Sequence, residues 1–275
     1  MRERPYLFGE TGGLLGILSE PEPATDRPTV LLLNAGLVHR VGPFRMGVDL
    51  ARRLAAVGFP AFRLDLSGLG DSGPRPGPFD LQDRALVDAQ DAMSFLAQRT
   101  GARRFIAAGL CAGALHAHGI AVSDPRVVGA VLLDGYAYPT LRFLVRRYGP
   151  RLISPSAVMR FALRRWGGLN AQAQPQRGPV SEADILDLAF PPQAQVGEDL
   201  HQLMERGVQL LFVYSGNWFS YFNYREQLHD NFADVPFGGR LSVEYFPDAD
   251  HTYTLLPDRE RLFERVVSWV QACFR

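Results

Sequence analysis

The sequence has 275 residues, of which 47% are hydrophobic, and its formal net charge is zero. A chain of this length can form one large domain with a substantial core, and its neutral balance argues against nucleic acid as a partner. All 29 basic residues are arginines, so the composition excludes a catalytic lysine and any mechanism through a lysine Schiff base.

The cysteines and the apolar segments bear on the location of the protein. Cys111 and Cys273 are too few for a disulfide framework, and a working thiol suits a reducing compartment. Residues 1–5 carry no apolar signal-peptide core, and no apolar run approaches the roughly 20 residues that a membrane-spanning helix needs. We therefore expect a cytoplasmic protein without a transmembrane segment.

The hydrophobic pattern alternates between strands and helices along the chain. Short apolar runs predict strands at residues 6–8, 14–18, 29–33, 60–66, 105–109, 127–133, 208–214 and 241–246. Apolar positions three to four residues apart predict helices at residues 47–56, 80–98, 112–120 and 259–274. This alternation is typical of α/β proteins, and we predict a mainly parallel, doubly wound sheet.

One long stretch between two predicted strands, residues 138–206, breaks this alternation. Helices are expected there at residues 140–148, 156–166, 182–189 and 198–205, with a polar linker at 170–179. An insertion at this point would lie over the carboxyl ends of the strands, where α/β proteins bind their ligands. We expect residues 138–206 to form a helical lid, inserted before the last two strands between two parts of one core, residues 1–137 and 207–275.

The most informative motif follows the strand predicted at 105–109 and reads Gly109-Leu110-Cys111-Ala112-Gly113. A nucleophile between two glycines, on a sharp turn from a strand into a helix, forms a nucleophile elbow. The glycines are needed because a Cβ at either position would collide with the strand or the helix beside it. The alternative is a buried cysteine that serves as a small apolar residue at a tight turn.

Two further segments support the elbow. Residues 65–73 form a glycine-rich loop at the end of a predicted strand, and His251 follows the last predicted strand. A nucleophile first and a histidine last is the chain order of the hydrolase triad built on this elbow. Asp248 and Asp250 lie too close to His251 in the sequence to face its ring, so we expect them to shape its loop.

These segments carry a resemblance that covers nearly the whole chain. The sequence resembles α/β hydrolases, and among them bacterial hydrolases with a Cys elbow, including the exosortase-A-associated hydrolase-like group and thioesterase-like proteins. The resemblance rests on residues 34–43, 63–73, 109–114 and 250–252. It implies the α/β-hydrolase fold, with Cys111 as the nucleophile and His251 as the base. It also implies oxyanion-hole donors at Ala112, Gly36 and Leu37.

The third member of the triad departs from the family pattern. The resemblance implies a Ser-Gly-x-Asp turn after the strand at 208–214, but the sequence there reads Ser215-Gly216-Asn217. Asn217 could orient the imidazole without carrying charge, as in Cys-His-Asn proteases. Asp134, directly after the strand at 127–133, is the other candidate for this role. Alternatively, Asp134 only caps the turn into the lid. Both residues stay candidates for orienting His251.

A thiol nucleophile favours acyl thioesters as substrates. Its attack on a thioester gives another thioester, so the acyl-enzyme lies close to the substrate in free energy and transfers readily to a good nucleophile. We therefore expect a Cys-dependent acyl-thioester hydrolase or acyltransferase. One alternative is a carboxylester or lactone hydrolase, and another is a non-catalytic binding protein of the same fold.

The sequence gives no sign of a cofactor or a metal site. It has no P-loop, no dinucleotide-binding fingerprint and no zinc-like ligand spacing. His116 and His118 follow the elbow two residues apart and do not share a helix face, so we expect them to pack rather than to bind a metal.

Arginines without acidic neighbours gather in the predicted lid. Residues 138–180 contain no Asp or Glu, and their arginines are interleaved with apolar residues. We expect this face to dock an anionic partner, either an acyl or peptidyl carrier protein or the phosphates of coenzyme A. A membrane surface and a merely solvated helix face are the alternatives. The candidate docking residues are Arg142, Arg146, Arg147, Arg160, Arg164 and Arg165.

Overall fold

The centre of the structure is an eight-stranded, mostly parallel sheet. The computed structural model describes residues 1–274 except 11, 78–80, 154–189 and 217–220. The strands are β1 (Arg2–Phe8), β2 (Leu14–Glu20), β3 (Thr29–Leu32), β4 (Ala61–Leu64), β5 (Phe105–Leu110), β6 (Val127–Leu133), β7 (Gln209–Ser215) and β8 (Leu241–Phe246). Their order is β1-β2-β4-β3-β5-β6-β7-β8, and only the pairs β1–β2 and β2–β4 are antiparallel.

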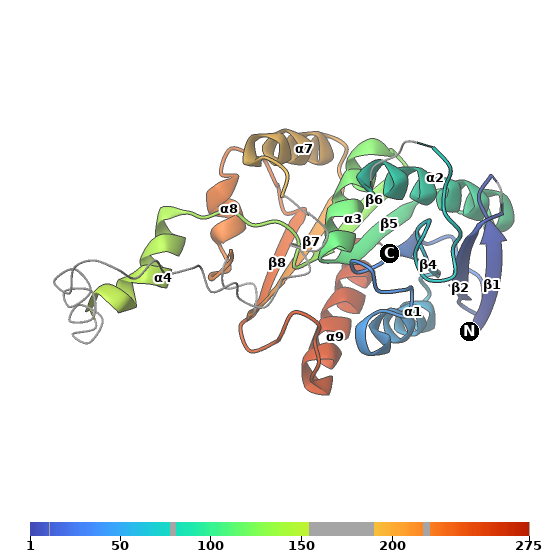
Figure 1. Ribbon diagram of the computed structural model, residues 1–275, viewed down its shortest axis with the longest axis horizontal. Helices are drawn as coiled ribbons and strands as arrows, with labels where there is room; N and C mark the ends of the chain where they lie inside the picture. The colour runs from blue at the N-terminus through green and yellow to red at the C-terminus, as the bar shows by residue number, and fades with distance from the viewer. Residues whose placement is uncertain (11, 78–80, 154–189, 217–220, 275) are drawn as a thin grey trace, which may run out of the picture.

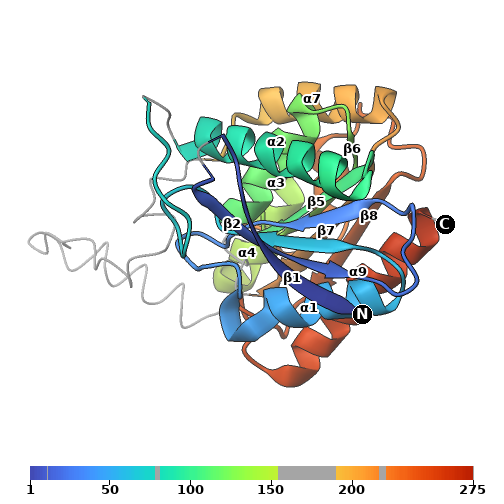
Figure 2. The same ribbon diagram turned by 90° about the vertical axis from the view of Figure 1, so that its right-hand side faces the viewer.

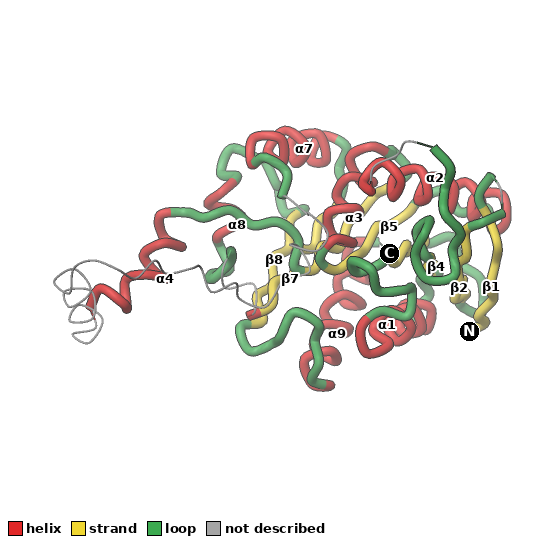
Figure 3. The backbone as a smooth tube through the Cα atoms, viewed as in Figure 1, coloured by secondary structure: helices red, strands yellow, loops and turns green. Residues whose placement is uncertain are grey.

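Helices cover both faces of this sheet (Figure 1, Figure 2). One layer holds α2 (Leu81–Thr100), α3 (Ala112–Ser123) and α7 (Gln193–Glu205), and the other holds α1 (Met46–Ala56) and α9 (Leu256–Cys273). Figure 3 shows how strands and helices follow one another, including η1 (Pro43–Arg45), α4 (Leu141–Ile153) and α8 (Gln227–Asn231). The predicted α/β fold with a doubly wound sheet is confirmed. No helix in the described ranges is both long and apolar enough to cross a bilayer.

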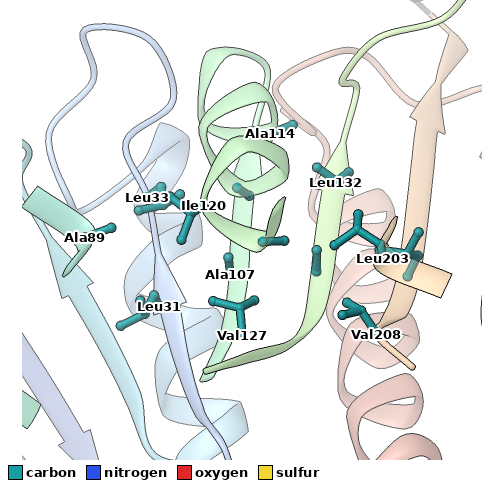
Figure 4. Close-up of a cluster of buried hydrophobic side chains, with 14 of the residues drawn as sticks. Leu31, Leu33, Ala89, Ala107, Ala114, Ile120, Val127, Leu132, Leu203 and Val208 are labelled. Atoms are coloured by element: carbon teal, nitrogen blue, oxygen red, sulfur yellow. The ribbon is translucent and has the colours of Figure 1, made fainter. Parts of the chain in front are cut away.

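Apolar side chains fill the space on each side of the sheet. The central strands β3, β4 and β5 are buried along their whole length, because helices cover both of their faces. Leu31 and Ala107 belong to the core beneath α2, α3 and α7 (Figure 4), whereas their neighbours Val30 and Ile106 pack with Leu54 of α1. Successive residues of a strand point to opposite faces, so each strand contributes to both cores.

The helix α7 lies in the layer over the sheet and not in a lid. The sequence analysis assigned residues 138–206 to the insertion, which includes this helix. Leu200 and Leu203 are fully buried in the same cluster as Leu132 of β6 (Figure 4). An apolar stripe of this kind must be buried against another element, and here that element is the sheet. We therefore assign α7 to the core.

The helix α4 stands away from the sheet (Figure 1). It is fastened to the segment before α8, where Asn223 Nδ2 donates a hydrogen bond to the carbonyl oxygen of Phe143 at 3.1 Å. The helices predicted at 156–166 and 182–189 and the linker at 170–179 lie outside the described residues. The extent of the lid therefore stays a prediction.

Candidate active site

The turn from β5 into α3 carries Cys111. This residue has φ 57° and ψ −117°, a conformation that side chains rarely adopt, and it is the N-cap of α3. A Cβ on Gly109 would lie 2.2 Å from the backbone of Gly113, and one on Gly113 would lie 2.5 Å from the carbonyl oxygen of Asn34. Close backbone contacts therefore require both glycines, as expected for an elbow.

The neighbouring strand β6 ends beside this elbow. The N–H of Cys111 donates a hydrogen bond to the carbonyl oxygen of Leu133 at 2.9 Å. Asp134, the next residue, is fully buried and has a positive φ of 46°. Its carboxylate accepts hydrogen bonds from the N–H and the hydroxyl of Ser215, both at 2.6 Å. Adjacent strand ends therefore place a thiol and a fixed carboxylate close together.

His251 lies between the thiol and the carboxylate. Its Nδ1 is 2.8 Å from Asp134 Oδ2, and its imidazole also hydrogen-bonds the Cys111 side chain. Since a carboxylate only accepts hydrogen bonds, Nδ1 carries the hydrogen in the pair with Asp134, and Nε2 is the nitrogen left for Cys111. Of the two candidates for orienting His251, Asp134 makes the contact, whereas Asn217 lies outside the described residues.

The loop of His251 is shaped by Asp250. This carboxylate accepts hydrogen bonds from the N–H groups and the hydroxyls of Thr252 and Thr254, at distances of 2.8 to 3.1 Å. Burial would raise the pKa of Asp250, but these hydrogen bonds outweigh burial and lower the pKa below its usual value. The structuring role predicted for this aspartate is confirmed.

The surroundings of His251 favour its protonated form. Burial alone would lower the pKa of this histidine, but the interactions with Asp134 and Cys111 outweigh burial and raise the pKa to about 10. At neutral pH His251 is therefore an imidazolium, which is the form that stabilises a neighbouring thiolate.

We expect the substitution Cys111→Ala to lower the pKa of His251, because one of the two interactions that raise it is lost. An NMR titration of ¹⁵N-labelled histidine measures this. Wild-type His251 should keep its proton through pH 8, whereas the variant should lose it at a lower pH. His201 on α7 is the internal reference, and an unchanged midpoint for His251 would contradict its contact with Cys111.

The predicted oxyanion donors share one cavity. Gly36, Leu37 and Ala112 all line it, and Ala112 is the first residue of α3, where helix geometry leaves the N–H without a partner in the helix. The loop is bent by a turn in which the N–H of Val38 donates to the carbonyl oxygen of Ala35 at 3.0 Å. In the part of the chain that the structure describes, the N–H groups of Gly36 and Leu37 donate no hydrogen bond.

A buried aspartate that the sequence analysis did not single out anchors this loop. The Oδ1 of Asp65, after β4, accepts hydrogen bonds from the N–H of Arg40 at 2.6 Å and from Asn34 Nδ2 at 3.1 Å. The guanidinium of Arg40 pairs with its Oδ2, and Asn34 Oδ1 accepts from the N–H of Leu66 at 2.8 Å. The signal in the sequence was a carboxylate at the carboxyl end of a buried strand, directly before a glycine-rich loop.

The predicted docking arginines lie partly within the described chain. Arg142, Arg146 and Arg147 are on α4, and Arg160, Arg164 and Arg165 fall outside the described residues. Arg142 pairs with Glu226 at 3.4 Å and lies over the ring of Tyr224, 4.4 Å from its centroid. Arg146 lies 5.6 Å from the same centroid.

A mainly parallel sheet, an elbow after β5 and a histidine after β8 define an α/β hydrolase. The family model described as serine aminopeptidase, S33, matches residues 29–173, just over half of the chain, and the chain belongs to this family. A comparison with curated proteins found no match.

Solved structures of similar fold include several hydrolases. An esterase of Pyrococcus furiosus is 14% identical, with 98% of this chain and 90% of that chain covered and a TM-score of 0.64. An α/β serine hydrolase homologue from Coxiella burnetii is 13% identical, with 98% and 97% covered and a TM-score of 0.59. A thermophilic esterase from Thermogutta terrifontis is 18% identical, with 99% of both chains covered and a TM-score of 0.54. At these identities the likeness establishes the fold.

Proposed function

We propose that the protein is a Cys-dependent acyl-thioester hydrolase or acyltransferase that works through a covalent acyl-Cys111 intermediate. The observation that carries this proposal is the line of contacts from the elbow cysteine through His251 to the buried Asp134. The triad would hold a sulfur nucleophile where members of a serine-hydrolase family hold an oxygen. A free thiol of this kind suits a reducing, cytoplasmic setting.

The chemistry follows from the positions of these groups. The Cys111 thiolate attacks the carbonyl carbon of the substrate, and the resulting oxyanion accepts hydrogen bonds from Ala112 N–H and from the loop of Gly36 and Leu37. The tetrahedral intermediate expels the leaving thiolate, which takes the proton held by His251. Water or another acceptor then gives its proton to His251 as it attacks the acyl-enzyme, and the Cys111 thiolate departs.

Ester or lactone hydrolysis is the second candidate. It is supported by the fold of this chain, which is shared with the esterases of Pyrococcus furiosus and Thermogutta terrifontis. The same thiolate and oxyanion donors would serve an ester, but the acyl-enzyme would then form from a substrate with a poorer leaving group. Thioesters therefore remain the substrates that the site supports best.

Intact mass spectrometry tests the proposal. Acyl thioesters of N-acetylcysteamine, p-nitrophenyl esters and an aminoacyl p-nitroanilide are mixed with the protein, and the acyl mass on Cys111 is followed over time. We expect an adduct with thioesters that is lost in Cys111→Ala and is strongly reduced in His251→Ala. Its decay in water, compared with its decay after addition of alcohols or amines, separates a hydrolase from an acyltransferase.

Each other outcome overturns the proposal in a defined way. Turnover of esters alone would favour the second candidate, and turnover of the anilide alone would favour a peptidase. No adduct with any substrate, despite alkylation of the Cys111 thiol by iodoacetamide, would indicate a binding protein.

We also propose that the arginine face on α4 receives the phosphates of a coenzyme A or carrier-protein thioester. Replacing Arg142 and Arg146 together by alanine is expected to raise the KM for acyl-CoA about tenfold, because two cationic side chains are removed from one face. The KM for the matching N-acetylcysteamine thioester, which has no phosphate, should stay unchanged. Equal effects on both substrates, or none, would contradict docking. Binding of the protein to anionic vesicles would instead favour a membrane surface.

A further inference from the structure

The loop that follows β3 is held by side-chain contacts rather than by regular structure. Residues 33–42 form neither a helix nor a strand, and they include Gly36 and Leu37, whose N–H groups are the expected oxyanion donors. The loop begins against the elbow, because a Cβ on Gly113 would lie 2.5 Å from the carbonyl oxygen of Asn34. The two N–H groups can meet an oxyanion only while the loop keeps this position.

Asp65 fastens this loop at both ends. Its Oδ1 accepts hydrogen bonds from Asn34 Nδ2 at 3.1 Å and from the N–H of Arg40 at 2.6 Å. Its Oδ2 accepts one from the N–H of Asp71 at 3.1 Å and another from the Arg40 guanidinium. The side chain of Asp65 is fully buried, and a buried carboxylate is stable only when it is paired and hydrogen-bonded.

The guanidinium of Arg40 joins the loop after β3 to the loop after β4. Among the residues that the structure describes, Arg40 is the only cation that pairs with Asp65, and its Nη1 also lies 2.7 Å from Asp71 Oδ2. The two carboxylates differ in their surroundings, since none of the Asp65 side chain is exposed and 65% of the Asp71 side chain is. An exposed ion pair contributes little, whereas loss of one partner of a buried pair is costly. The contact with Asp65 is therefore the more important of the two.

We infer that Arg40 is a positioning residue, whose guanidinium keeps the N–H groups of Gly36 and Leu37 in place for the oxyanion by neutralising the buried Asp65. The inference rests on the proposed function, since it takes these two N–H groups as donors to the oxyanion. Without the guanidinium, the buried carboxylate loses its counter-charge, and residues 34–40, which it holds, lose their fixed position. A displacement of about 1 Å at a catalytic group is enough to cost roughly 100-fold in rate.

Two reactions of the same thiol test this role. Acylation of Cys111 by an N-acetylcysteamine thioester forms an oxyanion, whereas alkylation by iodoacetamide expels iodide and forms none. Arg40→Met, which removes the charge and keeps an unbranched side chain, should lower the acylation rate at saturating thioester about 100-fold, with the half-saturating concentration unchanged. Alkylation of Cys111, followed by peptide mass spectrometry, should stay within about twofold of the wild-type rate. An equal loss in both reactions would show that the contact of the thiol with His251 is disturbed, and would overturn the inference.

A second arginine provides the matched control. Arg75 has the same exposed fraction as Arg40, 14% of the side chain, and it also pairs with a fully buried carboxylate, that of Asp88, and with a second acid, Asp91. None of these three control residues belongs to the loop after β3. Arg75→Met should therefore keep the wild-type acylation rate. A loss as large as that in Arg40→Met would indicate a general effect on the fold and would overturn the positioning role.

Two milder variants grade the effect. Arg40→Lys keeps the charge but not the planar fork of donors, and it should lower the acylation rate by about tenfold. Asp71→Asn removes only the exposed pair, and it should lower the rate by less than about threefold. If circular dichroism shows that Arg40→Met does not fold, Arg40→Lys carries the comparison with iodoacetamide. An unchanged acylation rate in the Arg40 variants, or a loss in Asp71→Asn as large as theirs, would contradict the inference.

Amide hydrogen exchange separates this inference from the proposed function. If no thioester acylates wild-type Cys111, the proposed function fails, and the hold on the loop is then judged without any reaction. The N–H of Val38 donates to the carbonyl oxygen of Ala35 at 3.0 Å, within the loop. We expect this amide to exchange about tenfold faster in Arg40→Met than in the wild type and in Arg75→Met. Equal exchange rates in the three proteins would show that Arg40 does not hold the loop.

Discussion

Replacing Cys111 by alanine is expected to lower kcat for acyl thioesters by about 10⁶-fold, because the covalent intermediate can no longer form. In enzymes with a catalytic triad, loss of the nucleophile costs about as much as loss of the whole triad, and the rate that remains comes from substrate binding and the oxyanion hole. Release of the thiol from an acyl thioester, followed with a chromogenic disulfide reagent, measures this loss.

The second cysteine provides the control for this experiment. Cys273 lies at the end of α9, far along the chain from the elbow, and its thiol is free. Cys273→Ala should therefore keep the wild-type kcat. A Cys111→Ala protein that keeps a tenth of the activity would show that the thiol is not the nucleophile.

The substitution Asp134→Asn is expected to lower kcat by about 10²-fold in the native protein and by about 10⁴-fold when Cys111 is also replaced by serine. In serine enzymes, an asparagine in place of the acid leaves the imidazole in the wrong tautomer and costs about 10⁴-fold. The thiol depends less on the acid, because its own interaction with His251 helps to hold the imidazolium.

A double-mutant cycle measures this difference. The kcat values of the wild type, both single variants and the double variant are compared on one thioester. Equal factors for Asp134→Asn in the two backgrounds would contradict the idea that the thiol and the carboxylate share the stabilisation of His251. Full activity of Asp134→Asn in both backgrounds would instead favour Asn217 as the residue that orients His251.

Hydrophobic patterns were sufficient to predict most strands of the sheet, but they did not predict where each helix begins and ends. The strand expected at 241–246 coincides with β8, because Leu241, Val243 and Tyr245 alternate with the polar Ser242 and Glu244, as is typical of a half-buried strand. The last helix begins at Leu256 rather than at residue 259, since a proline fits the first turn of a helix. The apolar stripe of α7 predicted a helix, but the pattern contains no information on which element the stripe contacts.

Motif spacing indicated Cys111 and His251, but it left the acid open. The position of Asp134 follows from the register of β5 and β6, in which the N–H of Cys111 bonds to the carbonyl oxygen of Leu133. No local pattern encodes that contact between strands.

The hydrogen bonds between Asp134 and Ser215 fix the carboxylate of the proposed triad without contacts from the described part of the segment that joins β6 to β7. The chain leaves the sheet at Asp134 and returns through β7 to Ser215, which holds both carboxylate oxygens. These hydrogen bonds join the two ends of the connection at the sheet, and α7, packed on the sheet, is a second anchor. We therefore expect α4, which stands away from the sheet and outside these anchors, to be exchangeable in evolution. Its length and composition can diverge under selection for new substrates while the reacting atoms keep their positions.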